Sequence, residues 1–160
     1  MKTNKIPQFL SIILIILVSF TSCSSDDDAS NNSNNEALIQ DVINVVQSGT
    51  WRITSFVDSG QNETSDFTGY DFTFMSNGTL SATNGGTNMN GIWSVTDSST
   101  SSSSSDDDID FNINFNVSEE DPFEDLNDDW DIVSYSANQL NLIDISGGNG
   151  GTDTLTFEKN

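Results

Sequence analysis

The sequence contains no histidine and only one cysteine, Cys23. Without histidine, the chain cannot form a His-based metal site, a Ser-His-Asp triad or a Cys-His dyad. A single cysteine also cannot form a disulfide within the chain. These absences exclude much of the common hydrolase chemistry, and we expect a protein that is not an enzyme.

Basic residues are almost as scarce, with 4 Lys and Arg against 25 Asp and Glu. Lys2 and Lys5 precede Cys23 in a stretch without acidic residues, so residues 23–160 keep only Arg52 and Lys159 and carry a net charge of -23. This charge repels nucleic acid and anionic lipid headgroups and attracts cations or basic partners. We therefore expect no nucleic-acid partner. The simpler interpretation is that the charge keeps a surface protein soluble.

The 160 residues suggest one folded domain behind an export signal. Two lysines near the start precede a nearly unbroken apolar run from Phe9 to Phe20, about 12 residues long. A membrane-spanning helix needs about 20 residues, so the run is typical of a signal peptide. Cys23 follows directly after two small polar residues. The alternative is an ordinary secreted protein with a buried or free thiol at this position.

The residues up to this cysteine, Phe20-Thr21-Ser22-Cys23, resemble the lipobox of bacterial lipoproteins, in which Leu usually stands where this chain has Phe20. In that family a signal peptidase cuts before the cysteine, whose nucleophilic sulfur carries a diacylglycerol. The resemblance implies that residues 1–22 are a signal peptide and that Cys23 is lipidated. The protein would then be anchored in a membrane by its acyl chains.

Residues 23–35 form a polar segment that we expect to be an acidic tether. The run Ser24-Ser25-Asp26-Asp27-Asp28 resembles the surface-export signal of Bacteroidota lipoproteins. That resemblance implies a lipid-anchored protein of the outer membrane, exposed at the cell surface. The alternative is a solvated tether without a targeting role.

Residues 36–160 are predicted to form the folded domain, beginning with a short helix. Ser33 and Glu36 have the spacing of a capping box, and residues 37–47 carry a nearly helical apolar stripe. Gly49 is a natural helix stop. Because the stripe is rich in β-branched residues, a strand is the alternative interpretation.

From Trp51 onward, apolar residues recur at every second position, which is typical of strands with one buried face. Asn77-Gly78 predicts a hairpin turn, because both residues tolerate positive φ. We expect about eight short strands, which carry the apolar residues Trp51, Ile53 and Val57; Tyr70, Phe72 and Phe74; Leu80 and Ala82; Trp93 and Val95; Ile109, Phe111, Ile113, Phe115 and Val117; Trp130 and Ile132; Leu140 and Leu142; Leu155 and Phe157.

Sequential strands without a βαβ rhythm predict an all-β fold, a small antiparallel up-and-down barrel of about eight strands after the short helix. The domain resembles the lipocalin-like domains of Bacteroidota lipoproteins. The resemblance lies in Ser48-Gly49-Thr50-Trp51, in Tyr70-Asp71-Phe72-Thr73-Phe74 before Asn77-Gly78-Thr79, and in Gly91-Ile92-Trp93-Ser94. It implies a fold but no particular ligand.

Aromatic residues of these strands are the candidates for binding a small-molecule or glycan ligand. They are Trp51, Tyr70, Phe72, Trp93 and Trp130. Their alternation with polar residues also places them on the buried face, where they would fill the core instead. A barrel of eight strands can be filled by its own side chains or hold one small ligand.

Two acidic tracts offer oxygen ligands for calcium, although neither has the spacing of an EF-hand loop. The candidate ligands are Asp121, Asp125, Asn127 and Asp129. The alternative is a solvated acidic loop, and we expect no other cofactor. Paired carboxylates can also serve a glycosidase, but the sequence indicates no apolar pocket that would raise the pKa of one of them.

These observations together predict a lipid-anchored cell-surface protein with a non-enzymatic, lipocalin-like binding domain. Two other functions remain open. One is a structural or accessory envelope protein with a filled barrel, and the other is an acidic adhesion module stabilised by calcium. The oligomeric state is not predicted.

Overall fold

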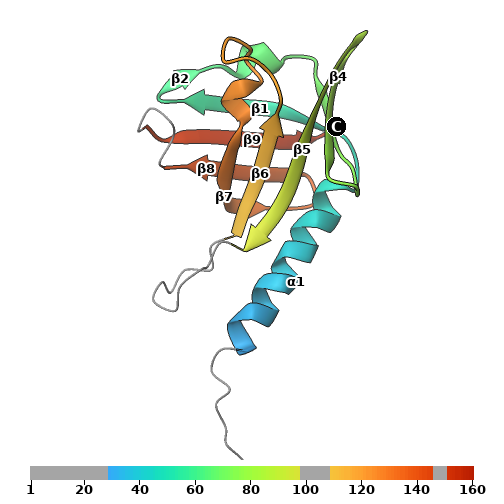
Figure 1. Cartoon of the computed structure of the whole chain (residues 1–160), viewed down its shortest axis with the longest axis vertical. Coiled ribbons are helices and arrows are strands. Elements are labelled where there is room, and N and C mark those ends of the chain that lie inside the picture. Colours follow the sequence, from blue (N-terminus) through green and yellow to red (C-terminus); the bar gives the residue numbers. More distant parts are fainter. Residues whose placement is uncertain (1–28, 98–108, 146–150) are drawn as a thin grey trace, which may run out of the picture.

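The computed structural model of the chain describes residues 29–97, 109–145 and 151–160. Eight antiparallel strands close into a barrel (Figure 1). One helix precedes the barrel, and one extra strand of two residues pairs with its first strand. This architecture confirms the predicted all-β fold. The elements are α1 (Ala29–Val46), β1 (Trp51–Asp58), β2 (Gln61–Asn62), η1 (Thr64–Phe67), β3 (Asp71–Phe74), β4 (Thr79–Asn84), β5 (Thr87–Asp97), β6 (Ile109–Phe115), η2 (Glu124–Leu126), β7 (Asp128–Tyr135), β8 (Gln139–Asp144) and β9 (Asp153–Lys159).

The barrel closes between its first and last strands. β1 pairs with β9 from Trp51 opposite Lys159 to Val57 opposite Thr154, while its pairing with β3 consists of Trp51 opposite Phe72. The short β1–β3 seam is bridged by the last residue of the chain. The Asn160 amide donates to the Thr50 carbonyl oxygen at 3.0 Å, and the Asn160 side chain donates to Asp71 at 2.6 Å.

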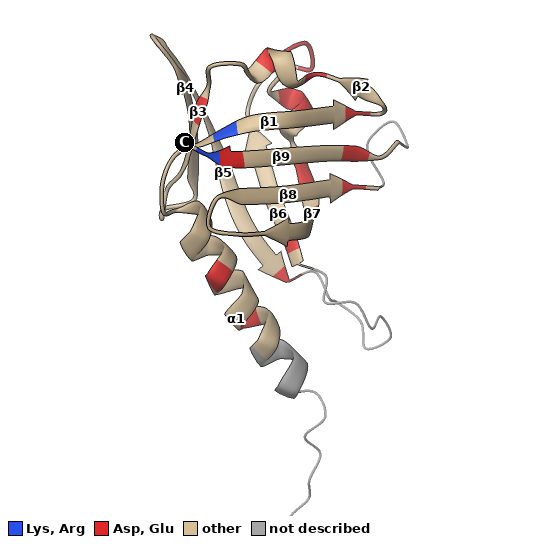
Figure 2. Cartoon of the chain, turned by 180° about the vertical axis from the view of Figure 1, so that it is seen from behind, with Lys and Arg blue, Asp and Glu red and all other residues tan. Residues whose placement is uncertain are grey.

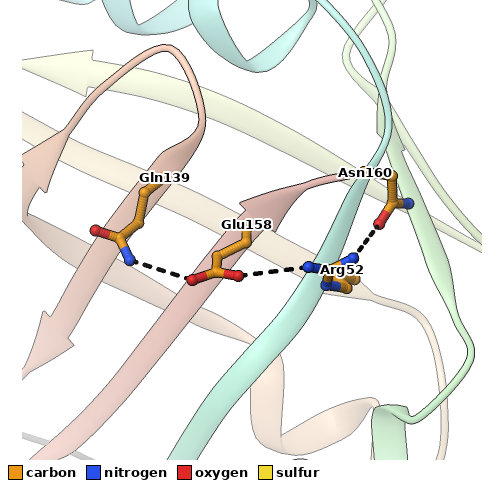
Figure 3. A network of polar contacts seen from close by, with 4 residues as sticks. All are labelled: Arg52, Gln139, Glu158 and Asn160. Atoms are coloured by element: carbon orange, nitrogen blue, oxygen red, sulfur yellow. Dashed lines mark hydrogen bonds and ion pairs between the residues drawn. The ribbon is translucent and has the colours of Figure 1, made fainter.

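A polar network on β1, β8 and β9 lies beside this closure (Figure 3). Arg52 forms an ion pair with Glu158 at 3.5 Å and donates a hydrogen bond to Asn160 at 3.5 Å. Gln139 on β8 donates to the other carboxylate oxygen of Glu158 at 3.5 Å. Because these side chains are exposed and the contacts are long, we assign the network a minor share of the stability. The paired backbones close the barrel.

The helix begins earlier than the sequence predicts. It starts at Ala29 rather than near Ala37, so Ser33 lies inside the helix and is not its N-cap. The expected polar tether therefore contributes its last residues to the helix. Asn35 is buried, and its side chain donates a 3.1 Å hydrogen bond to Asp97 at the end of β5. This tertiary contact stabilises a polar turn of the helix, which apolar patterning does not predict.

The expected alternation fails at one position of β1. The register against β9 shifts between Ile53 and Ser55, which is a β-bulge. Phe56 is therefore buried, whereas the predicted core residue Val57 is only half-buried. One extra residue reverses the faces of every residue that follows it.

Of the two residues expected to allow positive φ in the turn before β4, only one adopts it. Gly78 has φ +81°, whereas Asn77 keeps a negative φ and accepts a 3.0 Å hydrogen bond from the Thr79 amide.

Gly91 on β5 is required for a different reason, which is the space around its Cα atom. A Cβ atom there would lie 2.5 Å from the Asn114 carbonyl oxygen and 2.8 Å from the Phe115 ring. The Gly-x-Trp element of the sequence therefore permits a close approach between β5 and β6.

Candidate functional site

The predicted aromatic ligand residues belong to the core. Trp51, Phe72, Trp93 and Trp130 are buried, and Tyr70 is half-buried beside them. Each indole N–H donates to a backbone carbonyl, as expected for a buried tryptophan. The acceptors are the oxygens of Val46 at 2.8 Å for Trp51, Met75 at 3.0 Å for Trp93 and Leu126 at 3.1 Å for Trp130.

Phenylalanine rings occupy much of the remaining interior. Phe123 lies on the loop before η2, and its ring centroid is 4.9 Å from that of Phe115 and 5.4 Å from that of Phe67. Phe72 and Phe74 both meet Phe157 edge to face, at 5.4 and 5.6 Å. An eight-stranded barrel has room for its own side chains or one small ligand, and here the rings take that room.

The four predicted calcium ligands are not gathered around one point. Asp121 accepts a 3.0 Å hydrogen bond from the Phe123 amide and so shapes the entry into η2. Asn127 is engaged with the backbone of Phe115, accepting from its amide and donating to its carbonyl oxygen at 3.0 Å. Within the described ranges, no group of three or more Asp, Glu, Cys or His side chains is arranged to hold a metal ion.

Carboxylates gather at the end of the barrel that carries η1 and η2. Figure 2 shows acidic residues where β1 and β8 end and where the antiparallel β9 begins. Burial, and then the negative charge of Asp125, raise the pKa of Glu63. Burial, and then the charge of Asp58, raise the pKa of Asp125. Mutual repulsion of this kind disfavours several ionised carboxylates at one place and is not itself a binding site.

A crevice of about 410 Å³ lies outside the barrel, between α1 and β7. Figure 1 shows α1 crossing the end of the barrel where β5 ends and β6 begins. The volume of the crevice falls within the usual range for small-molecule sites. The residues that line the crevice are Leu38, Val42, Ile109, Asp131, Ile132, Val133, Ser134 and Tyr135.

An irregularity of β7 explains how five consecutive residues can line one crevice. A regular strand would turn alternate side chains to opposite faces. Here the register against β8 shifts between Ile132 and Ser134, which leaves Val133 as the extra residue of a β-bulge. Bulges re-aim side chains and are common beside functional sites. In the described part of the sheet, β6 pairs with β7 only as far as Asp131, and α1 lies beside the stretch beyond it.

A polar contact ties the helix to β7 at the edge of the crevice. The Tyr135 hydroxyl donates a 2.9 Å hydrogen bond to Asp41 on α1. Burial, followed by this bond and the negative charge of Asp41, raises the pKa of Tyr135. The hydroxyl therefore remains protonated and holds the Asp41 carboxylate beside the crevice.

Sequence patterning did not predict the crevice residues as a site. The available signal was the adjacent apolar pair Ile132-Val133, which interrupts the alternation of β7. Val133 is 61% exposed, although it directly follows Ile132, which packs against the core. An exposed apolar residue beside a break in period is consistent with a bulge, but it does not indicate that a helix lies beside it.

Cys23 and the predicted signal peptide lie outside the described residues. Among the residues that are described, no helix is long and apolar enough to cross a membrane. The lipid anchor therefore stays a prediction from the sequence.

No protein-family model and no curated protein matches the chain. Among solved structures, the chain is similar to a crystal structure of a DUF4847 family protein from Bacteroides vulgatus, with 19% sequence identity and a TM-score of 0.46. The match covers 74% of this chain and 97% of that chain. The function is accordingly inferred from the residues and geometry of this chain.

Proposed function

We propose that the chain is a lipid-anchored protein of the bacterial outer membrane, exposed at the cell surface, and that its barrel is a non-enzymatic binding module. The ligand occupies the crevice between α1 and β7 instead of the barrel interior. The observation that carries this proposal is the contrast between the two places. The interior holds the packed rings of Phe72, Phe123 and Trp130, whereas the crevice is an apolar concavity with polar groups at its edge.

The anchor is supported by the short apolar run that ends near Cys23 and by the acidic segment that follows it. Its test is labelling of cells with a radioactive or clickable fatty acid. The wild-type chain should incorporate the label, and Cys23→Ser should not. Ser22→Ala is the control, since it leaves the acceptor sulfur in place. Label retained on Cys23→Ser would rule out this anchor.

The binding site is tested with a soluble neutral probe, phenylbutanol, on the full chain in lipid nanodiscs. Isothermal titration, corrected with protein-free nanodiscs, should show saturable binding to the wild type. Val133→Trp places a larger side chain in the crevice and should weaken that binding at least about ten-fold, the equivalent of 1.4 kcal/mol. Ile92→Trp is the matched control, because Ile92 on β5 is exposed to nearly the same extent, 63% against 61%.

The filled interior also favours a second function, that of a structural or accessory envelope protein without a ligand. The two functions differ in the same titration. Saturable binding that is lost in Val133→Trp and kept in Ile92→Trp supports the binding module. A wild-type chain that binds no probe favours the structural function.

A further inference from the structure

The apolar lining of the crevice is continuous from its floor to its edge. Val42 on α1 and Ile109 at the start of β6 are buried, and Ile132 packs against the core beside them. At the edge, Leu38 and Val133 are 36% and 61% exposed. Apolar area that a ligand covers here is removed from water, which favours binding. The crevice therefore suits the hydrocarbon or aromatic body of a ligand.

The polar edge of the crevice is acidic. Asp131 is one of the lining residues, and Tyr135 holds Asp41 beside them through its hydrogen bond. No lysine or arginine is among the lining residues. The two basic residues in the described part of the chain are engaged on other elements, Arg52 with Glu158 and Lys159 with Ser48 at 2.8 Å.

This combination selects against anions. An anionic head beside two acidic residues would be repelled, because like charges that lie close together destabilise one another. A cationic head would instead be attracted by the same two acidic residues. The net charge of -23 on residues 23–160 adds a weaker, salt-screened attraction for cations.

We infer that the crevice binds a small cationic amphiphile, with its apolar body against Val42, Ile109 and Ile132 and its positive charge beside Asp131 and Asp41. The inference rests on the proposed binding function and names the ligand class for the same site. Apolar burial supplies affinity, and the two acidic residues supply the preference for positive charge.

The test compares three ligands that share one body and differ in the head: phenylbutylammonium, phenylbutanol and phenylbutyrate. Each is titrated into the full chain in lipid nanodiscs, with protein-free nanodiscs subtracted. We expect the cation to bind about ten-fold more tightly than the alcohol, and the anion more weakly than the alcohol. High salt should narrow these differences, because the acidic edge is in contact with solvent.

Asp41→Asn is the decisive variant, since asparagine keeps an oxygen that can accept the Tyr135 bond. It should reduce the cation's advantage over the alcohol by about three- to ten-fold while leaving the affinity for the alcohol unchanged. Asp131→Asn is the second variant and should act in the same direction. Asp66→Asn is the charge-matched control. Asp66 lies on η1, at the end of the barrel away from α1 (Figure 1), and its loss should leave the preference intact.

The outcomes separate this inference from the proposed function. Equal binding of the three ligands, or an equal effect of Asp41→Asn and Asp66→Asn, overturns the cationic ligand while the binding module stands. Binding of none of the three overturns both. A cation preference that Val133→Trp leaves untouched would locate the cation elsewhere and also refute the inference.

Discussion

The Tyr135 hydroxyl donates a hydrogen bond to Asp41, 94 positions away in the chain, and this bond joins α1 to β7 beside the crevice. The helix thereby forms one wall of a concavity whose other wall is a bulged strand. Neither element presents the crevice by itself. The bond also explains why an acidic residue on the exposed face of the helix is held close to apolar residues.

Tyr135→Phe should lower the free energy of unfolding by about 0.5–1.5 kcal/mol, because it removes one partly exposed hydrogen bond. The effect should depend on pH. Burial and Asp41 raise the pKa of Tyr135, so its contribution is complete below the unfolded value of about 10 and is lost as pH rises through the higher folded pKa. Urea unfolding at pH 7 and above pH 10 measures both effects.

The wild type should therefore lose more stability than Tyr135→Phe at alkaline pH. Tyr70→Phe is the control, since it removes the other tyrosine hydroxyl of the chain and leaves the Asp41 contact intact. Parallel pH profiles for the wild type and Tyr135→Phe would contradict the assignment of this bond.

Phe123→Ala should destabilise the barrel by about 3–5 kcal/mol, the usual cost of truncating a buried phenylalanine. Phe123 is buried against the rings of Phe67, Tyr70 and Phe115, with centroids 4.9 to 5.4 Å away. Urea unfolding followed by tryptophan fluorescence measures the loss. Val133→Ala, at an exposed site, should change stability by no more than about 0.5 kcal/mol. A loss below about 1 kcal/mol in Phe123→Ala would mean that the interior is not closely packed.

Asn127→Asp should cost about 1–3 kcal/mol at neutral pH, although it changes the side chain by one atom. The amide N–H that donates to the Phe115 carbonyl oxygen is lost, and a negative charge takes its place. Acidification should restore part of the stability, since a protonated aspartic acid can donate again. Asn116→Asp adds the same charge at an exposed position beside β6. Equal losses in the two variants would show that charge alone is responsible.

Asp128→Asn should make the protein more resistant to urea at neutral pH. Burial, and then a side-chain hydrogen bond with Asp129, raise the pKa of Asp128 from 3.8 to about 6. A raised folded pKa means that the stability from Asp128 is complete below about pH 4 and is lost as pH rises through about 6. Asparagine keeps the oxygen that accepts the Asp129 amide at 2.9 Å.

The urea midpoints of the wild type and Asp128→Asn should therefore agree closely at pH 4 and separate by pH 7.5, with the variant higher. Glu120→Gln, in an exposed loop, removes the same charge and serves as the control. A constant difference between the midpoints across this range would refute the raised pKa.

Most of the barrel follows from local patterning. The alternation from Ile109 to Phe115 predicts both the strand and its buried face, and Gly78 predicts the turn before β4. These features depend on neighbours in sequence, because a strand turns every second side chain to the same face. The eight strands could be predicted for this reason, and so could the burial of Trp51 and Trp130.

The features that were missed depend on partners distant in sequence. The first turns of α1 are polar, and a contact from Asn35 to Asp97 joins them to the barrel. The bulge in β1 that buries Phe56 instead of Val57 is a property of its pairing with β9. The choice between the two interpretations of the aromatic residues, core or ligand site, also depended on the tertiary structure, because a small closed barrel needs its large rings to fill the interior.

The sequence by itself determined the acidic charge, the lack of histidine chemistry and the alternation that makes the domain a barrel, since each depends on composition or on adjacent residues. The tertiary structure alone decided where a concavity exists. The crevice requires a helix that packs beside a strand about 90 residues further along the chain, together with a bulge at Val133 that arises in the pairing of β7 with β8. A pattern of neighbouring residues contains no information about which distant segment comes to lie beside it.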